Sequence, residues 1–413
     1  MGNIKLALFL ALKSFLKGNR WTLALIVLVM SLSFTNLVLT PSIMSGVTQA
    51  INQQQINTLF GNILIDPPRG QYYLDNISRI ESAVNSTAGV AAVAPHLNSS
   101  ALFQYHWQQV ASPDNQAQSG QWNVIGIDPQ KEARVTTIHD SLIAGSYLAP
   151  GDTDQIMLGV EVAGGPEASS RPFLTLGGVK VGDQVRLKFA NGTVQVFTVK
   201  GIIKALNGEA NNLAYIPISA MASVLGPGVT PENASQLLIR TQPGSNDNEI
   251  ISRLKALGIQ GQVRSWTDYG SGIGATVSSF SSIASLIGGI GLMVAGVVMF
   301  IVIYINVSHK KRQIGILRAI GVNRGVVLTS YLIQTLLYAI AGIILGGILI
   351  GYVIRPFFNS HPIELPIGLV SLAIDSSTLR NGIIGLLAAA ILAGIIPVLN
   401  TTRISIIKAI WGN

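Results

Sequence analysis

The side chains that could perform covalent chemistry or bind a metal are scattered along this 413-residue chain. His96, His106 and His139 lack metal-ligand spacing, so we expect loop or core histidines and no metal site. The chain has no cysteine, which excludes disulfides and thiolate sites. The sequence contains no G-x-S-x-G motif, so we expect no nucleophile elbow of the hydrolase type. It also contains no Gly-Lys dipeptide, so we expect no P-loop for ATP. An enzyme that acts alone is therefore the least supported function.

The densest group of basic and apolar side chains lies between residues 309 and 324. Ile316 and Ile320 are four residues apart, so they can share one face of a helix. Ile314 and Leu317, three residues apart, can do the same. The segment 308–324 has five basic residues and no acidic one. Two interpretations are equally open: an amphipathic helix that rests on the membrane surface, or a helix that docks on a partner protein.

The formal net charge of +8 is concentrated in three short segments. Residues 1–20 and 308–324 contain basic charges alone, and the C-terminal tail adds Arg403 and Lys408. The long segment 42–279 instead has 14 basic and 17 acidic residues. Basic residues beside apolar stretches follow the positive-inside rule and not the pattern of a nucleic-acid footprint. We therefore expect membrane lipids, and no nucleic acid, among the partners.

Four uncharged stretches are long enough to cross about 30 Å of hydrocarbon. They predict an integral membrane protein with four transmembrane helices, a large α+β extracytoplasmic domain between the first two, and both termini in the cytoplasm. For the first stretch, a cleaved signal peptide is the alternative, but its length and the lack of an A-x-A-like site argue against it. The predicted order is a cytoplasmic amphipathic N-terminus (1–20), a first span (21–41), the extracytoplasmic domain (42–279), a second span (280–307), a cytoplasmic helix (308–324), a third span (325–353), an extracytoplasmic loop (354–380), a fourth span (381–400) and a cytoplasmic tail (401–413).

The segment 42–279 has the patterns of a folded α+β domain. Asn191-Gly192 between two alternating runs predicts a β-hairpin from Val185–Ala190 and Thr193–Lys200. Gly258 stands where a helix-ending glycine belongs. The polar run Gln49–Thr58 predicts a helix that continues from the first span. Further predicted strands are Gly61–Ile65, Gln121–Ile127, Gln155–Val160 and Gln236–Arg240, predicted helices are Leu74–Val84 and Asn248–Leu257, and Ala111–Gly120 is predicted as a polar loop.

Small residues recur within the predicted spans at spacings that let helices approach closely. They are Ser281, Ser285, Gly288, Gly289 and Gly296 in the second span, and Gly342 and Gly346 in the third. Packing within one chain and a seam between two chains explain this pattern equally well. No Asp, Glu, Lys or Arg lies inside a span, which argues against an ion-coupled secondary transporter.

The run Lys311–Gly321 resembles the hallmark of the FtsX-like, or MacB/LolC/LolE-type, ABC transporter permeases, a type VII family that works by mechanotransmission. The C-terminal stretch Ile396–Ile410 resembles the closing segment of that family, and a weaker likeness occurs at Val179–Val185. In that family the hallmark reads R-x-E-I-G-I-L-R/K-A-I/L-G and forms a coupling helix that docks on the ATPase. The resemblance assigns this role to Arg312, Gln313, Ile314, Gly315, Ile316, Leu317, Arg318, Ala319, Ile320 and Gly321. Gln313 and Gln334 stand where the family often has Glu, and Ser405 replaces a proline.

The resemblance further implies a MacB-like periplasmic core domain at 42–279 and a location in the inner, or cytoplasmic, membrane. It implies two permease chains, identical or paralogous, and two ATPase subunits that bind ATP and Mg²⁺, with no cofactor in this chain. A periplasmic adaptor or lipoprotein carrier is a further implied partner. The implied function is extraction or export of a lipoprotein, lipid, drug or peptide. The alternative is an FtsX-type signalling permease that regulates an extracytoplasmic hydrolase without transport.

Overall fold

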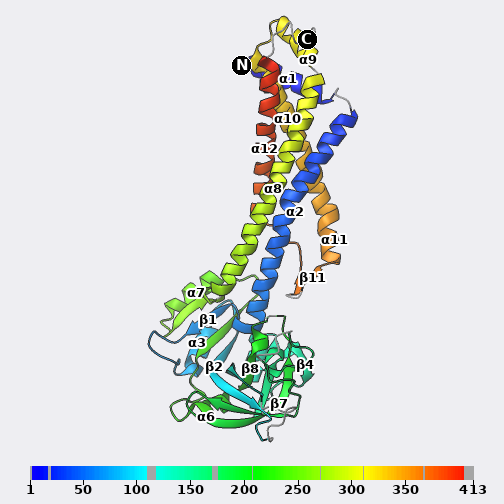
Figure 1. Ribbon diagram of the computed structural model, residues 1–413. Helices are drawn as coiled ribbons and strands as arrows, with labels where there is room; N and C mark the ends of the chain where they lie inside the picture. The colour runs from blue at the N-terminus through cyan, green and yellow to red at the C-terminus, as the bar shows by residue number, and fades with distance from the viewer. Residues whose placement is uncertain are drawn as a thin grey trace. The chain divides into compact units, whose positions relative to one another are not determined.

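The computed structural model describes residues 2–16, 20–108, 118–169, 175–206, 208–269, 271–309, 311–365 and 368–403. The chain divides into two compact units, coloured along the chain in Figure 1. The helical unit comprises residues 1–50, 275–365 and 369–413, and the α+β unit comprises residues 51–274 and 366–368.

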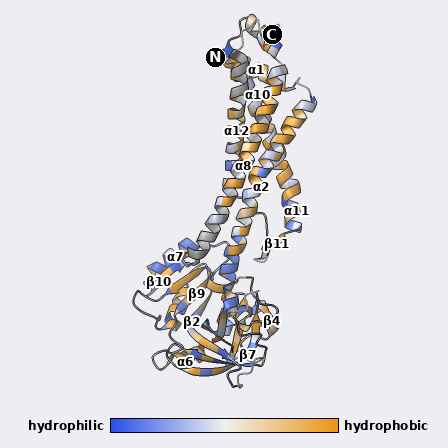
Figure 2. Cartoon of the chain, viewed as in Figure 1, coloured by the Kyte–Doolittle hydropathy of each residue, from blue (hydrophilic) through white to orange (hydrophobic). Residues whose placement is uncertain are grey.

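Four long helices of the described residues are apolar enough to span a membrane, which confirms the predicted four-span architecture. Figure 2 colours the chain by the hydropathy of each residue, with hydrophobic residues in orange. They are α2 (Arg20–Gln55), α8 (Ser271–His309), α10 (Arg324–Leu349) and α12 (Ser376–Arg403). Helix α2 continues unbroken through Pro41 and through most of the predicted polar extension, and the π-helical turn η1 (Ile56–Phe60) follows it.

Shorter elements complete the helical unit. Helix α1 packs on α10, because Ala7 and Ala11 are fully buried and the Phe15 and Tyr338 rings lie 5.4 Å apart. The segment 354–380, predicted as a loop, contains regular structure: the helix of the third span continues past residue 353, and two short strands follow it. The remaining elements are α1 (Gly2–Leu16), α9 (Lys311–Ala319), the π-helical turn η6 (Ile350–Ile354), α11 (Arg355–Ser360), β11 (Ile363–Leu365) and β12 (Gly368–Val370).

The strands of the α+β unit form a single ten-stranded sheet within the described residues, in the order β10-β1-β9-β2-β3-β8-β5-β7-β4, with β6 between β2 and β7. They are β1 (Ile63–Asp66), β2 (Val90–Tyr105), β3 (Gln118–Ile127), β4 (Leu142–Gly145), β5 (Gln155–Gly159), β6 (Gln184–Phe189), β7 (Val194–Ile203), β8 (Leu213–Pro217), β9 (Gln236–Thr241) and β10 (Gln262–Ser265). Its helices are α3 (Ile77–Asn85), α4 (Pro129–Val135), α5 (Val160–Ala163), α6 (Ile218–Leu225) and α7 (Asp247–Ala256). Short 3-10 turns are η2 (Ile138–Ser141), η4 (Ala210–Asn212) and η5 (Trp266–Asp268).

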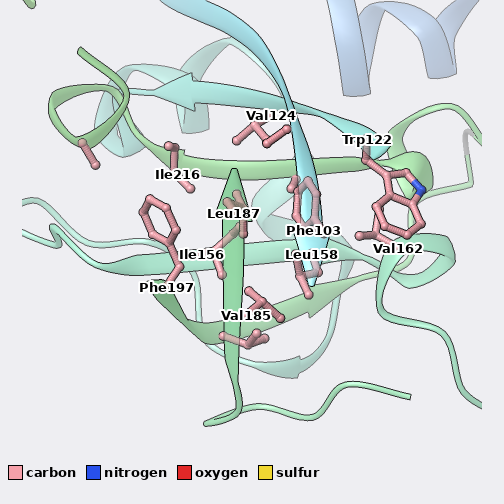
Figure 3. Packing of buried hydrophobic residues seen from close by; sticks show 14 of the residues in the cluster. Phe103, Trp122, Val124, Ile156, Leu158, Val162, Val185, Leu187, Phe197 and Ile216 are labelled. Carbon is pink, nitrogen blue, oxygen red and sulfur yellow. The ribbon is translucent and has the colours of Figure 1, made fainter. Parts of the chain in front are cut away.

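Six of these strands close into a barrel. Strand pairing runs from β2 through β3, β8, β5, β7 and β6 and returns to β2. Alternate side chains of each strand point inward and fill the barrel, as Figure 3 shows for Phe103, Val124, Leu187 and Ile216. Phe103 and Trp122 meet edge to face with ring centroids 5.4 Å apart. The other side chains of the same strands point away from the barrel.

A second core lies beside the barrel, where α3 and α7 pack on the strands β1, β9 and β10. Ile77 and Val84 of α3 and Ile250 and Leu254 of α7 supply its helical side. The long strand β2 belongs to both cores, since Val90 and Val93 line the second core and Phe103 lines the barrel. One sheet therefore contributes side chains to both of these cores.

Four of the six predicted strands and the α7 helix are confirmed to within two residues. The β6–β7 hairpin is confirmed, although β7 continues three residues beyond the predicted end, and Gly258 ends its helix with φ +66°. Two further predictions had wrong boundaries, one for a helix and one for a loop. Helix α3 begins at Ile77 and not at Leu74, because Asn76 adopts a left-handed conformation with φ +56°. The predicted loop Ala111–Gly120 ends earlier, because Gln118–Gly120 pair with β2, and residues 109–117 lie outside the described residues.

Candidate functional site

The run that resembles the coupling hallmark forms helix α9, Lys311–Ala319. Ile314 is only 2% exposed and packs into the core of the helical unit, where Val307 of α8 and Val327 of α10 also lie. Gly315 is buried beside it. One turn of α9 is therefore fixed to the spans that precede and follow it.

The other side of α9 is exposed. Ile316 and Ile320 are 48% and 74% exposed, and Arg312 and Gln313 are exposed as well. The side chains of Leu317 and Arg318, which the sequence also assigns to this surface, lie outside what the structure describes, as does Lys310. The isoleucines of the motif thus divide into one anchor, Ile314, and two apolar side chains that nothing covers within the described chain.

A tight turn joins α9 to α10. Gly321 has φ +97°, a conformation that non-glycine residues rarely adopt. Asn323 then caps α10, since its Oδ1 accepts a hydrogen bond of 3.0 Å from the Gly325 amide. We did not predict this cap, although an Asn directly before an apolar helical run is a recognised N-cap signal. The turn holds the exposed face of α9 in a defined orientation relative to α10.

The small residues of the third span pack within the chain. A Cβ atom at Gly342 would lie 2.3 Å from Met30 Cβ, and one at Gly346 would lie 2.9 Å from both Phe34 Cδ1 and Ser31 O. Both glycines therefore allow α10 to approach α2 closely. A role for them in a second interface stays a prediction.

The small residues of α8 have different surroundings. Within the described residues, no atom lies within 4 Å of a Cβ built at Gly288, Gly289 or Gly296, and Ser285 is exposed. The side chain of Ser281 lies outside the described residues. A contact that we did not predict occurs at Gly291, where a Cβ would lie 2.6 Å from Asn36 Oδ1. A role for these small residues in a seam between two chains stays a prediction.

Gln334, singled out because relatives often have Glu there, is 3% exposed. Its Nε2 donates a hydrogen bond of 2.5 Å to the Tyr338 hydroxyl one turn later. A neutral amide suits this buried position because it needs no counter-charge. Of the predicted histidines, His96 is a core residue paired with Glu132, and the described residues contain no cluster of metal ligands.

The contrast between neighbouring glycines of α10 gives a direct test of the packing. Gly346→Leu should destabilise the helical unit by about 1–3 kcal/mol, because the new side chain overlaps Phe34 and Ser31. Gly347→Leu is the matched control, since no atom of the described chain lies within 4 Å of a Cβ there. Thermal unfolding of the detergent-solubilised chain measures both. Equal midpoints for the two variants would contradict the α2–α10 contact.

Comparison with known proteins places these elements in a family. Residues 23–257 match the model of the MacB-like periplasmic core domain, and residues 285–406 match that of the FtsX-like permease C-terminal. The periplasmic region of MacB from Actinobacillus actinomycetemcomitans aligns with 55% of this chain and 97% of its own, at 14% identity and a TM-score of 0.35.

Curated relatives agree with the family models. The chain is 25% identical over 167 residues to the uncharacterized ABC transporter permease YknZ of Bacillus subtilis, covering 38% of this chain and 41% of the relative. It is 24% identical to the macrolide export ATP-binding/permease protein MacB of Hahella chejuensis, covering 49% and 31%. These matches span less than half of each relative. The lipoprotein-releasing system transmembrane protein LolC of Neisseria meningitidis is 23% identical, with 78% and 75% covered. Since the two family models account for both units, the chain belongs to the FtsX/MacB/LolC-type family of ABC transporter permeases.

Proposed function

We propose that this chain is the membrane subunit of a transporter whose ATP is hydrolysed by a separate ATPase. The observation that supports this proposal most directly is α9, where Ile314 anchors the helix and Ile316 and Ile320 remain exposed. Exposed isoleucines on a helix tied to two spans are suited to insertion into a cleft of a partner protein. ATP and Mg²⁺ then bind to the partner, and this chain carries no cofactor.

The proposed mechanism is mechanical. Movement of α9 is transmitted along the spans and changes the arrangement of the α+β units, which extract or expel the substrate. The chain offers continuous connections for this purpose, because α2 runs unbroken from Arg20 to Gln55 and η1 follows it directly. The turn η1 is fixed to the α+β unit through Asn57. The Asn57 carbonyl accepts a hydrogen bond from Thr137 N (2.7 Å), and its Oδ1 accepts one from Arg240 Nη1 (2.8 Å).

A second permease chain, identical or paralogous, is part of the proposal. Helix α8 is the least buried of the four candidate spans, and Gly288, Gly289 and Gly296 leave open space on its surface. A helix from a second chain can approach closely along such a row of glycines. Two permease chains would then carry two ATPase subunits.

The proposed substrates are amphiphilic molecules outside the cytoplasm. The names of relatives refer to macrolide export, syringafactin export and lipoprotein release. A lipoprotein, lipid, drug or peptide is consistent with these names, and an adaptor or lipoprotein carrier would receive it.

For the orientation, we propose that the N-terminus, the 308–324 segment and the C-terminus lie in the cytoplasm, as the basic residues indicate. Single cysteines can test this cleanly because the chain has none of its own. In intact cells, an impermeant thiol reagent should label Ser119→Cys and Asn359→Cys but neither Ser14→Cys nor Asn323→Cys. Labelling of Asn323→Cys before lysis, at the rate seen for Asn359→Cys, would show that the proposed orientation is wrong.

The decisive experiment for the function is affinity purification of the chain from its own host in mild detergent. We expect an ATPase with a P-loop and a second permease chain at one-to-one stoichiometry, and hydrolysis that responds to candidate amphiphiles. A bound ATPase together with an extracytoplasmic hydrolase and no transported molecule would favour the signalling alternative. A fully functional chain without any ATPase would reject the proposal.

A further inference from the structure

The outer surface of the barrel contains a pocket of about 410 Å³ that the proposed mechanism does not use. Four of its lining side chains are carboxamides: Asn98 of β2, Asn123 of β3, Asn212 before β8 and Gln236 of β9. We call it the amide pocket. Its size falls within the range of small-molecule sites in proteins, roughly 300–1,000 Å³.

Strand alternation explains why polar side chains gather here. Leu97 and Val124 point into the barrel, so their neighbours Asn98 and Asn123 point outward. Asn98 lies opposite Ile125, and Asn123 lies opposite Leu213, so amide and apolar side chains alternate across three adjacent strands. Leu59 and Phe60 of η1 form an apolar wall.

Two buried polar side chains in the wall are held from behind by carboxylates. His96 is 3% exposed, and its Nε2 lies 2.7 Å from Glu132 Oε2. Gln236 is 8% exposed, and its Nε2 donates a hydrogen bond of 3.0 Å to Asp66 Oδ1. Buried polar groups that are fixed in this way are pre-organised for a ligand, because little side-chain freedom is lost on binding.

The exposed amides have unused hydrogen-bonding capacity. The side chains of Asn98 and Asn123 make no hydrogen bond with any described residue of the chain. A carboxamide offers two donor hydrogens and an acceptor oxygen, which matches the N–H and C=O groups of a peptide bond. Side chains two residues apart on a strand are separated by roughly 7 Å, which is also the two-residue repeat of an extended peptide.

We propose that the amide pocket binds a short, uncharged, extended peptide segment that carries an apolar side chain. The carboxamides meet the peptide backbone, and the apolar side chain contacts Leu59, Phe60 and Leu213. An anionic ligand is disfavoured, because the described lining contains no Lys or Arg and its one carboxylate is Glu209. A lipid chain is disfavoured, because it would leave the carboxamides without partners.

The pocket also touches the segment that the mechanism moves. Leu59 and Phe60 belong to η1, which directly follows α2 in the chain. A bound peptide therefore contacts the end of the helix proposed to transmit force. Binding itself does not depend on the proposed function, because it can be measured with the chain alone and without an ATPase.

The test uses the purified full-length chain and a pool of N-acetylated, C-amidated pentapeptides composed of uncharged residues. Affinity selection with mass spectrometry should retain peptides that contain Leu or Phe, and the dissociation constant of a retained peptide is then measured by fluorescence anisotropy. Asn123→Arg should weaken binding by about tenfold or more, because it removes one carboxamide and puts a longer, charged side chain in the space of the uncharged peptide. Gln121→Arg is the matched control, since it places the same charge on the same exposed face of β3, two residues away and outside the pocket.

A second measurement does not depend on these variants. Ser100→Cys lies in the adjoining part of the same surface, and the chain has no other cysteine. A retained peptide should slow its modification by a maleimide about fivefold or more, whereas Ser119→Cys at the far end of β3 should react at an unchanged rate. Retention of no pentapeptide would overturn the proposal. Equal affinities of Asn123→Arg and Gln121→Arg, or a preference for acidic peptides or oligosaccharides, would also overturn it.

Discussion

Replacing Glu132 with alanine should destabilise the α+β unit by about 3–5 kcal/mol, because it leaves His96 buried without its partner. Glu132 is 1% exposed and lies 2.7 Å from His96 Nε2. It also accepts a hydrogen bond of 2.7 Å from Thr136 Oγ1. The pair connects α4 to the middle of β2, so its loss should increase local unfolding of both elements.

Hydrogen exchange of the full-length chain measures this effect locally. Peptides from α4 and from β2 around His96 should lose protection in Glu132→Ala by a factor of about 100 or more. The matched control is Glu81→Ala, which removes an ion pair to Lys131 on the same helix. That pair is as short, at 2.6 Å, but the Lys131 side chain is 41% exposed, so we expect about 1 kcal/mol or less. Similar losses of protection in the two variants would show that the buried His96–Glu132 pair stabilises the unit no more than the exposed pair does.

The same pair makes the unit sensitive to acid. Burial alone would raise the pKa of Glu132, but the charge of His96 and the hydrogen bonds from His96 and Thr136 hold it below the usual value of 4.5. A carboxylate with a lowered folded-state pKa stabilises the fold above its unfolded pKa, and this contribution disappears as the pH falls through the folded value. Protection near His96 should therefore decrease below about pH 4.5. In Glu132→Gln this part of the pH dependence should be absent.

Local patterns in the sequence predicted the elements that local interactions determine. The β6–β7 hairpin follows from Asn191-Gly192, because the turn residues alone fix the register of the two strands. Barrel closure could not be predicted, because the pairing of β2 with β6 joins Phe103 to Leu187 across a long stretch of chain. Strand β2 was missed because alanines and Pro95 obscure its alternation. Helix α4 could have been found from Asp128-Pro129, an N-cap residue followed by proline at the first position.

In the candidate site, too, local patterns predicted the elements but not the contacts between them. Periodicity placed Ile314, Ile316 and Ile320 on a helix but could not decide which side chain faces the rest of the chain. That choice depends on the positions of α8 and α10, whose residues bury Ile314. Likewise, spacing alone left Gly342 and Gly346 open to an intra-chain or an inter-chain role. The close approach of Met30 and Phe34 reveals the intra-chain contact.

Replacing Ile316 and Ile320 together with alanine should abolish stable association with the ATPase. If each side chain fills a cleft of the partner, its truncation costs at least about 2 kcal/mol, or roughly 30-fold in affinity. The double variant should therefore lose about 1,000-fold if the two losses add. Both side chains are exposed, so the variant should fold with unchanged thermal stability. Co-purified ATPase and substrate-stimulated hydrolysis are the two measurements.

Controls separate docking on a protein from contact with lipid. Ile4→Ala in α1 removes an isoleucine that is 68% exposed and also lies in a predicted cytoplasmic segment, and it should change neither measurement. Lys310→Ala should do little, since a rim charge contributes less than a buried apolar anchor. A helix that merely rests on lipid predicts the opposite order, because loss of a basic residue would then matter more than loss of Ile320. Full ATPase binding by the double alanine variant, together with an inactive Lys310→Ala, would therefore refute docking through α9 and favour the membrane-surface interpretation.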